Sequence, residues 1–224
     1  MVVIIFASKL LFADHPRLFV TPERIAEIRS AIQVEGSTHK EAYHALKARV
    51  DQFDWREFEE SLEDDNWNYA RSYTAQAAAF IYLMTEDTVY SNFAYDVLVQ
   101  VHSDPDPDGR LPEANYGLSR ATVGRGFGMA YDWCYHAWSD SQRTYIKDKI
   151  DLALDAWTSY SHANLNAPHR GSNWVAVCRG GELVMMLAAG EEVNRARRFQ
   201  NLKSWLQSHL MNGYGNIGFS QEGI

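Results

Sequence analysis

Apolar residues recur at spacings of three and four along almost every long segment of this 224-residue chain, and strand-like alternation is nearly absent. The segment from about Trp67 to Met84 shows the pattern clearly. Its apolar stripe consists of Tyr73, Ala77, Phe80, Ile81 and Met84. This spacing places the apolar side chains on one face of an α-helix, so the sequence predicts an all-α fold.

Start and stop signals divide the chain into helices that come in pairs. Thr21-Pro22-Glu23 combines a capping hydroxyl, a proline at the first helical position and an acid in the first turn. Ser139 and Gln142 have the spacing of a capping box. We expect helices over about 22–34, 37–50, 67–84, 88–102, 119–137, 139–159, 173–189 and 191–211.

The first members of the pairs begin near positions 22, 67, 119 and 173, a spacing of roughly fifty residues. Helix pairs at a regular spacing predict stacked helical hairpins. No low-complexity linker separates them, so we expect one domain over 14–224.

Residues 1–13 are apolar except for Ser8 and Lys9. They are too few for a membrane span, which needs about 20 apolar residues. They fit the remnant of a signal peptide, so we expect a periplasmic or secreted protein. No other segment approaches a transmembrane run, and we expect no membrane span.

Composition excludes several classes of protein. Lys+Arg total 21 and Asp+Glu total 29, a net charge of -8, which argues against a basic nucleic-acid binder. Aromatic residues make up 13%, too many for a disordered chain. Cys134 and Cys178 lie in apolar helical stretches, and we expect them to be buried free thiols.

Motifs for metal and nucleotide chemistry are missing from the sequence. It contains no His-Glu-x-x-His, no paired Cys-x-x-Cys and no Walker-type phosphate loop. The glycine-rich run from Gly124 to Gly128 follows no strand, so we interpret it as small residues that let two helices approach closely. We expect no cofactor and no metal.

The polar segment from His169 to Trp174 leads into an apolar helix and has two interpretations. In the first, Ser172 or Asn173 only caps the helix and Trp174 packs in the core. In the second, the helix N-terminus and the Asn173 amide bind an anion, His169 transfers a proton and Trp174 stacks on a sugar. The residues themselves leave both open.

Three further residues flank the loop after Gly109 and could contact a substrate: Tyr116, Arg120 and Arg125. An arginine fork suits a carboxylate, although pairing at the surface or at a helix end is the simpler alternative. Other aromatic side chains are most simply core residues. They are Tyr69, Tyr73, Trp133, Trp138 and Trp157.

Four short motifs occur in a particular order along the chain. They are Asp14-His15-Pro16-Arg17-Leu18-Phe19 before Thr21-Pro22-Glu23, Ala130-Tyr131-Asp132-Trp133 before Ser139 to Arg143, Ser172-Asn173-Trp174 before Gly180-Gly181, and Gly218-Phe219-Ser220 before Glu222-Gly223. In this order and spacing, from Asp14 to the end, the chain resembles heparinase II/III-like and oligoalginate-lyase-like polysaccharide lyases.

The resemblance implies an (α/α) toroid followed by β-sandwich domains, with this chain forming an incomplete toroid, truncated at its C-terminal end and lacking the sandwich. It implies β-elimination on a uronate-containing polysaccharide. Asn173 matches the residue that neutralises the sugar carboxylate, and His169 is a looser match for a proton-transfer residue. Glu222 would lie near the substrate, just before a catalytic Tyr located beyond Ile224. The net charge of -8 favours alginate or another weakly charged uronan over heparin.

Two other functions remain open from the residues. A glycoside hydrolase on a helical toroid needs two carboxylates across a cleft, and Glu113, Asp132 and Glu222 are available although no spacing pairs them. A non-catalytic, glycan-binding helical scaffold would bind the polysaccharide without turnover.

Overall fold

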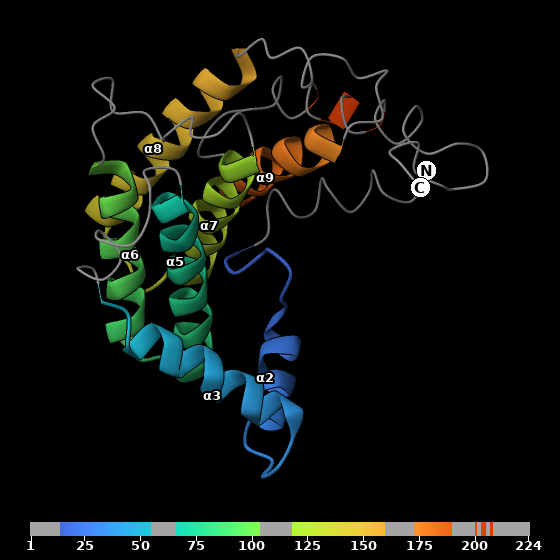
Figure 1. Ribbon diagram of the computed structural model, residues 1–224, viewed down its shortest axis with the longest axis vertical. Helices are drawn as coiled ribbons and strands as arrows, with labels where there is room; N and C mark the ends of the chain where they lie inside the picture. The colour runs from blue at the N-terminus through green and yellow to red at the C-terminus, as the bar shows by residue number, and fades with distance from the viewer. Residues whose placement is uncertain are drawn as a thin grey trace, which may run out of the picture.

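The computed structural model describes residues 14–54, 66–103, 118–159 and 173–189, with positions 200, 203, 204 and 207 beyond them. Within these residues all regular structure is α-helical (Figure 1), which confirms the all-α prediction. The helices are α2 (Pro22–Ala31), α3 (Thr38–Asp51), α5 (Asn66–Thr85), α6 (Thr88–Ser103), α7 (Leu118–Cys134), α8 (Asp140–Ser159) and α9 (Asn173–Ala189).

The helices begin where the capping signals predict. The Thr21 hydroxyl accepts from the Arg24 backbone N–H at 3.2 Å, and the Ser37 hydroxyl accepts from the Lys40 N–H at 3.1 Å. The Ser139 N–H donates to Gln142 Oε1 at 2.9 Å, and the Gln142 N–H donates to the Ser139 hydroxyl at 3.3 Å, as in a capping box. Residues 104–117, residues 160–172 and most of the helix expected over 191–211 lie outside the described residues.

Helix α7 lies between α5 and α9 (Figure 1). Along α5 and α7, Ser72 faces Gly126, and further on the rings of Phe80 and Trp133 are 6.1 Å apart. Contacts that advance together along both helices mean that the helices are parallel. The α7–α9 contacts advance in the same way and involve Ala121 with Gly181 and Gly128 with Met185.

Helices α6 and α8 return behind this parallel layer and form a second one. The Tyr95 ring of α6 and the Tyr145 ring of α8 are 6.1 Å apart, and the Trp138 indole N–H donates to the Ser91 carbonyl at 2.9 Å. The pairs α5–α6 and α7–α8 are therefore helical hairpins stacked in one direction, as the roughly fifty-residue spacing predicted.

Glycines allow α7 to approach both neighbours closely. A Cβ atom built on Gly126 would lie 2.7 Å from Ser72 Cβ on α5, and one on Gly128 would lie 2.9 Å from Val184 Cγ1 on α9. From the α9 side, a Cβ atom on Gly181 would lie 2.5 Å from the Ala121 carbonyl oxygen. The glycine-rich run therefore serves helix packing, which confirms its interpretation from sequence.

The core fills the space between the two layers. Trp133, Cys134 and Trp138 are buried, as predicted. Burial raises the pKa of the Cys134 thiol, which is free. The side chains of Cys178, Tyr69 and Trp157 lie outside the described part of the chain.

Two apolar positions contradict the sequence interpretation. Tyr73, expected in the core, is 39% exposed, and Val89, an apolar residue of the helix expected over 88–102, is 66% exposed. Val89 is the second residue of α6, whereas Tyr73 lies two turns into α5. A periodic stripe shows which side of a helix is apolar, but it does not show how far along the helix a neighbour covers that side.

Helices α2 and α3 pack at the C-terminal end of α5. The Arg29 guanidinium on α2 donates to the Leu83 carbonyl at 2.9 and 2.6 Å, and the Tyr90 hydroxyl on α6 donates to Asp51 of α3 at 2.8 Å. None of the helices in the described ranges combines the length and the hydropathy that crossing a bilayer requires.

Adjacent glycines on α9 provide a test of this packing. Replacing Gly181 with Ala forces α7 and α9 apart, and we expect a loss of about 1–3 kcal/mol in the free energy of unfolding. Gly180 is the control, because a Cβ atom added there would meet nothing within 4 Å in the described part of the chain. Gly180→Ala should gain about 0.5–1 kcal/mol, since alanine favours the helix. Equal effects of the two substitutions in urea denaturation would contradict the close contact at Gly181.

Candidate functional site

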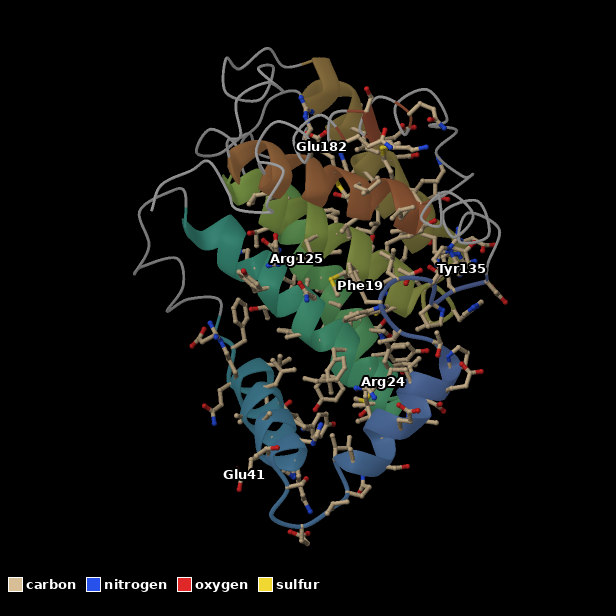
Figure 2. The ribbon with its side chains drawn as sticks, turned by 90° about the vertical axis from the view of Figure 1, so that its right-hand side faces the viewer. Phe19, Arg24, Glu41, Arg125, Tyr135 and Glu182 are labelled. Carbon is tan, nitrogen blue, oxygen red and sulfur yellow. The ribbon has the colours of Figure 1, made fainter. Side chains whose placement is uncertain are left out.

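The layer formed by α5, α7 and α9 has one side that faces away from α6 and α8, here called the inner face. Helical spacing assigns residues to it, starting from Arg125 and Asp132, which are seven positions apart on α7. Figure 2 looks onto this side of the molecule. The inner face consists of Tyr73, Ala77, Phe80 and Met84 on α5, Arg125, Met129 and Asp132 on α7, and Val177, Gly180 and Val184 on α9.

One half of the inner face, toward the C-terminal ends of the helices, is covered by residues 14–20. The attachment point is Asp132, which is 1% exposed. Its carboxylate accepts from His15 Nδ1 at 2.6 Å, from the Arg17 backbone N–H at 3.0 Å to each oxygen, and from the Leu18 backbone N–H at 2.8 Å. A buried carboxylate is costly unless donors of this kind surround it.

Neighbouring side chains complete the attachment. The Trp133 indole N–H donates to the Leu18 carbonyl at 3.1 Å. The His15 ring stacks on Tyr135 at 3.8 Å between centroids, and the Arg17 guanidinium donates to His15 Nε2. Because a carboxylate can only accept, Nδ1 of His15 donates to Asp132, while Nε2 faces the Arg17 guanidinium.

Two of the motifs quoted above thus meet in space. The run from Asp14 to Phe19 binds the run from Ala130 to Trp133, which lies more than one hundred positions later in the chain. Both carboxylate oxygens of Asp132 are occupied by this contact. Asp132 is therefore a structural anchor and is not available as one of the two carboxylates that a glycoside hydrolase needs.

The other half of the inner face, toward the N-terminal ends, is open. Tyr73 is 39% exposed, Val177 is 43% exposed, and a Cβ atom on Gly180 would meet nothing within 4 Å among the described residues. The Arg125 guanidinium lies over the Tyr73 ring, 4.9 Å from its centroid. Arg125 is half-buried, and its Nε has no hydrogen-bond partner among the residues that the structure describes.

The helix termini add positive potential at this open end. Because α5, α7 and α9 are parallel, their N-termini lie at the same end of the layer, and each N-terminus carries partial positive charge. The charged pair on α9 does not alter this, since Arg179 donates to Glu182 at 2.9 and 2.7 Å and both are buried. Together with Arg125, the open half of the inner face favours an anion.

The predicted site residues divide into two groups. Arg120 lies in the first turn of α7, and Asn173 and Trp174 begin α9, so all three lie at the N-terminal end of the layer, whereas Arg125 is the eighth residue of α7. The side chains of these three fall outside the described part. The remaining predicted residues, Tyr116, His169, Glu222 and Glu113, lie outside the described residues altogether.

Two contacts are not evident from the sequence. The periodicity of α5 places Tyr73 on the apolar stripe and so predicts a core residue, yet Tyr73 is the platform under Arg125. The anchoring role of Asp132 is also missed, although an aspartate inside the apolar run Ala130 to Trp133 signals a buried carboxylate that needs donors.

Neither a family model nor a curated protein matches the chain. Within the described ranges, no three His, Cys, Asp or Glu side chains are grouped so that they could hold a metal ion.

Replacing Asp132 with Asn tests the anchor. The amide group would set an N–H donor against the donors of His15, Arg17 or Leu18, and we expect a loss of about 3 kcal/mol in the free energy of unfolding. Limited proteolysis should cut the variant first near residues 14–20. Asp148, whose side chain is 60% exposed, supplies the control, and Asp148→Asn should change stability by less than about 0.5 kcal/mol. A stable, protease-resistant Asp132→Asn variant would refute the anchor.

Proposed function

We propose that this protein is a polysaccharide lyase that cleaves a uronate-containing polysaccharide by β-elimination, with the sugar chain bound along the open half of the inner face. The observation that supports this most is Arg125, a half-buried guanidinium that lies over the partly exposed Tyr73 ring on the open half of the inner face. A planar guanidinium fork suits a carboxylate, and the adjacent ring offers a flat apolar surface to the sugar.

β-Elimination has three requirements. The sugar carboxylate must be neutralised so that the C5 proton becomes acidic, a base must remove that proton, and an acid must protonate the departing glycosidic oxygen. Asn173 is the proposed neutralising donor. It is the first residue of α9 and precedes Val177 and Gly180 by four and seven positions, which places it on the stripe of α9 that belongs to the inner face.

His169, four residues before Asn173, is the proposed proton-transfer group, because an imidazole exchanges protons near neutral pH. Trp174, Tyr116, Arg120 and Glu222 are proposed substrate contacts. The resemblance implies that a catalytic Tyr also takes part.

The proposed architecture is an (α/α) toroid. Its support is the arrangement of parallel helices α5, α7 and α9 on one side and returning helices α6 and α8 on the other. Continued around an axis, such a stack would turn the inner face into the lining of a central cleft. The contact between the Asp14–Phe19 and Ala130–Trp133 motifs adds support, because the residues that carry the resemblance act together.

The decisive experiment treats polyuronates with the natural full-length protein and follows the products. Elimination leaves an unsaturated sugar that absorbs in the ultraviolet, and we expect this absorbance to grow with time. New reducing ends without absorbance would identify a hydrolase. Binding without either change would identify a glycan-binding scaffold. Either of these results would reject the proposed reaction.

Asn173 variants of the full-length protein separate catalysis from capping. If Asn173 neutralises the carboxylate, Asn173→Ala should lower kcat by roughly 10²–10³ with a smaller change in KM, because the interaction strengthens in the transition state. Asn173→Asp should be worse, since it brings a second negative charge to the carboxylate. If Asn173 is only a cap, Asp will keep both activity and stability, while Ala will lose about 1 kcal/mol of stability. Kinetics and thermal melts on both variants distinguish the catalytic role of Asn173 from the capping role.

Arg125 variants test recognition of the carboxylate. Arg125→Gln keeps hydrogen-bonding capacity but removes the charge, and we expect oligouronate affinity to fall by roughly ten-fold or more. Binding of the methyl-esterified, neutral oligosaccharide should change much less. Titration calorimetry with both ligands measures the difference. Arg24, which is exposed and pairs with Glu27 on the surface of α2, provides the control substitution Arg24→Gln.

A further inference from the structure

Phe19 combines a strained backbone with an exposed aromatic ring. Its φ is 61°, and the Val20 N–H donates across it to the Leu18 carbonyl at 2.7 Å, which forms a γ-turn with a positive central φ. Turns of this kind are rare and strained, above all with a bulky residue at the centre. The Phe19 side chain is 70% exposed, so burial of the ring does not offset the strain.

Glu86 is the useful comparison, since it also has a positive φ, of 60°. It follows the last residue of α5, and its backbone N–H donates to the Tyr82 carbonyl at 2.7 Å. A left-handed residue is a common way to end a helix, so helix termination explains Glu86. Phe19 precedes a helix and ends none, and that explanation does not apply to it.

Both sides of the Phe19 turn are fixed in place. The Leu18 N–H donates to Asp132, its carbonyl accepts from the Trp133 indole, and its side chain is 5% exposed. On the other side, Val20 packs against the core. The surroundings therefore hold the turn and leave the ring of Phe19 in solvent. Strain that is retained by well-fixed neighbours is typical of functional positions.

The turn lies where the covered half of the inner face meets the open half. Asp132, which binds Leu18, follows Arg125 by seven positions on the same side of α7, or about 10 Å along the helix. Figure 2 shows Phe19 and Arg125 on the same side of the molecule, in front of α5 and α7. An extended oligosaccharide bound at Arg125 can therefore reach Phe19 with a later sugar unit.

We propose that Phe19 is a stacking platform for one sugar ring of the bound polyuronate, at a subsite further along the sugar chain than the one at Arg125; this inference rests on the proposed function. The apolar C–H face of a pyranose matches an exposed phenyl ring, and the ring carries no charge that would repel the carboxylates. The γ-turn fixes the ring in position before binding, which reduces the entropy lost when the sugar docks.

Phe19→Gly in the full-length protein tests the platform, because glycine removes the ring and relieves the strain at once. We expect the dissociation constant for a defined oligouronate to rise roughly ten-fold, while the melting temperature stays equal or increases. Phe19→Trp should retain affinity, since it keeps an aromatic face. The matched control is Glu86→Gly, which relieves the same backbone conformation away from the inner face and should leave affinity unchanged.

The outcomes separate this inference from the proposed function. If the wild type binds the oligouronate and Phe19→Gly binds it equally well, Phe19 is no platform and the proposed function stands. If Phe19→Gly lowers the melting temperature, or changes the mass of the particle in solution, the ring serves protein packing and the inference is overturned. If the wild type binds no oligouronate at all, both the proposed function and the stacking role of Phe19 are rejected.

Discussion

The close approach of α7 to both α5 and α9 is the constraint on which the rest of the structure depends. The glycines of α7 face alternate sides: Gly126 meets Ser72 of α5, and Gly124 and Gly128 meet Gly181 and Val184 of α9. Side chains at these positions would separate the helices by their own width and open the layer. With the helices in backbone contact, the residues between these two lines of glycines, Arg125 among them, are directed to one common face.

Asp132 then divides that face into two halves with different roles. A buried carboxylate is costly unless donors surround it, and this one receives four hydrogen bonds from residues 15–18. Detachment of residues 15–18 would leave the Asp132 carboxylate without hydrogen bonds, so the 14–20 segment stays bound to the C-terminal half of the inner face. The open half remains at the end where the helix N-termini gather. The same contact positions Phe19 at the boundary, so one buried charge both covers the face and presents the ring.

Local chemistry makes much of the fold predictable. Capping hydroxyls at Thr21, Ser37 and Ser139 fix where helices begin. Each hydroxyl bonds a backbone N–H three residues later, so the contact forms without help from distant parts of the chain. The glycine run of α7 is identified correctly as a packing feature because no strand precedes it. The exposure of Tyr73 is not predictable in this way, because it depends on where the distant 14–20 segment ends on the inner face. The pairing of His15 with Asp132 likewise depends on tertiary contact between distant segments.

The hydrogen-bond partners of the arginine side chains support an anion site on the open half of the inner face. The other buried or half-buried arginines in the described ranges all donate to an oxygen or nitrogen acceptor: Arg17 to His15, Arg29 to Leu83, Arg71 to Gln100, Arg143 to Tyr135 and Arg179 to Glu182. Arg125 differs, because the contact found for it among the described residues is the face of the Tyr73 ring. A partly desolvated guanidinium without a carboxylate costs free energy that a bound carboxylate would recover. Under the proposed function, a uronate chain carries one carboxylate on every such sugar, so it would satisfy Arg125 and still offer a later ring to Phe19.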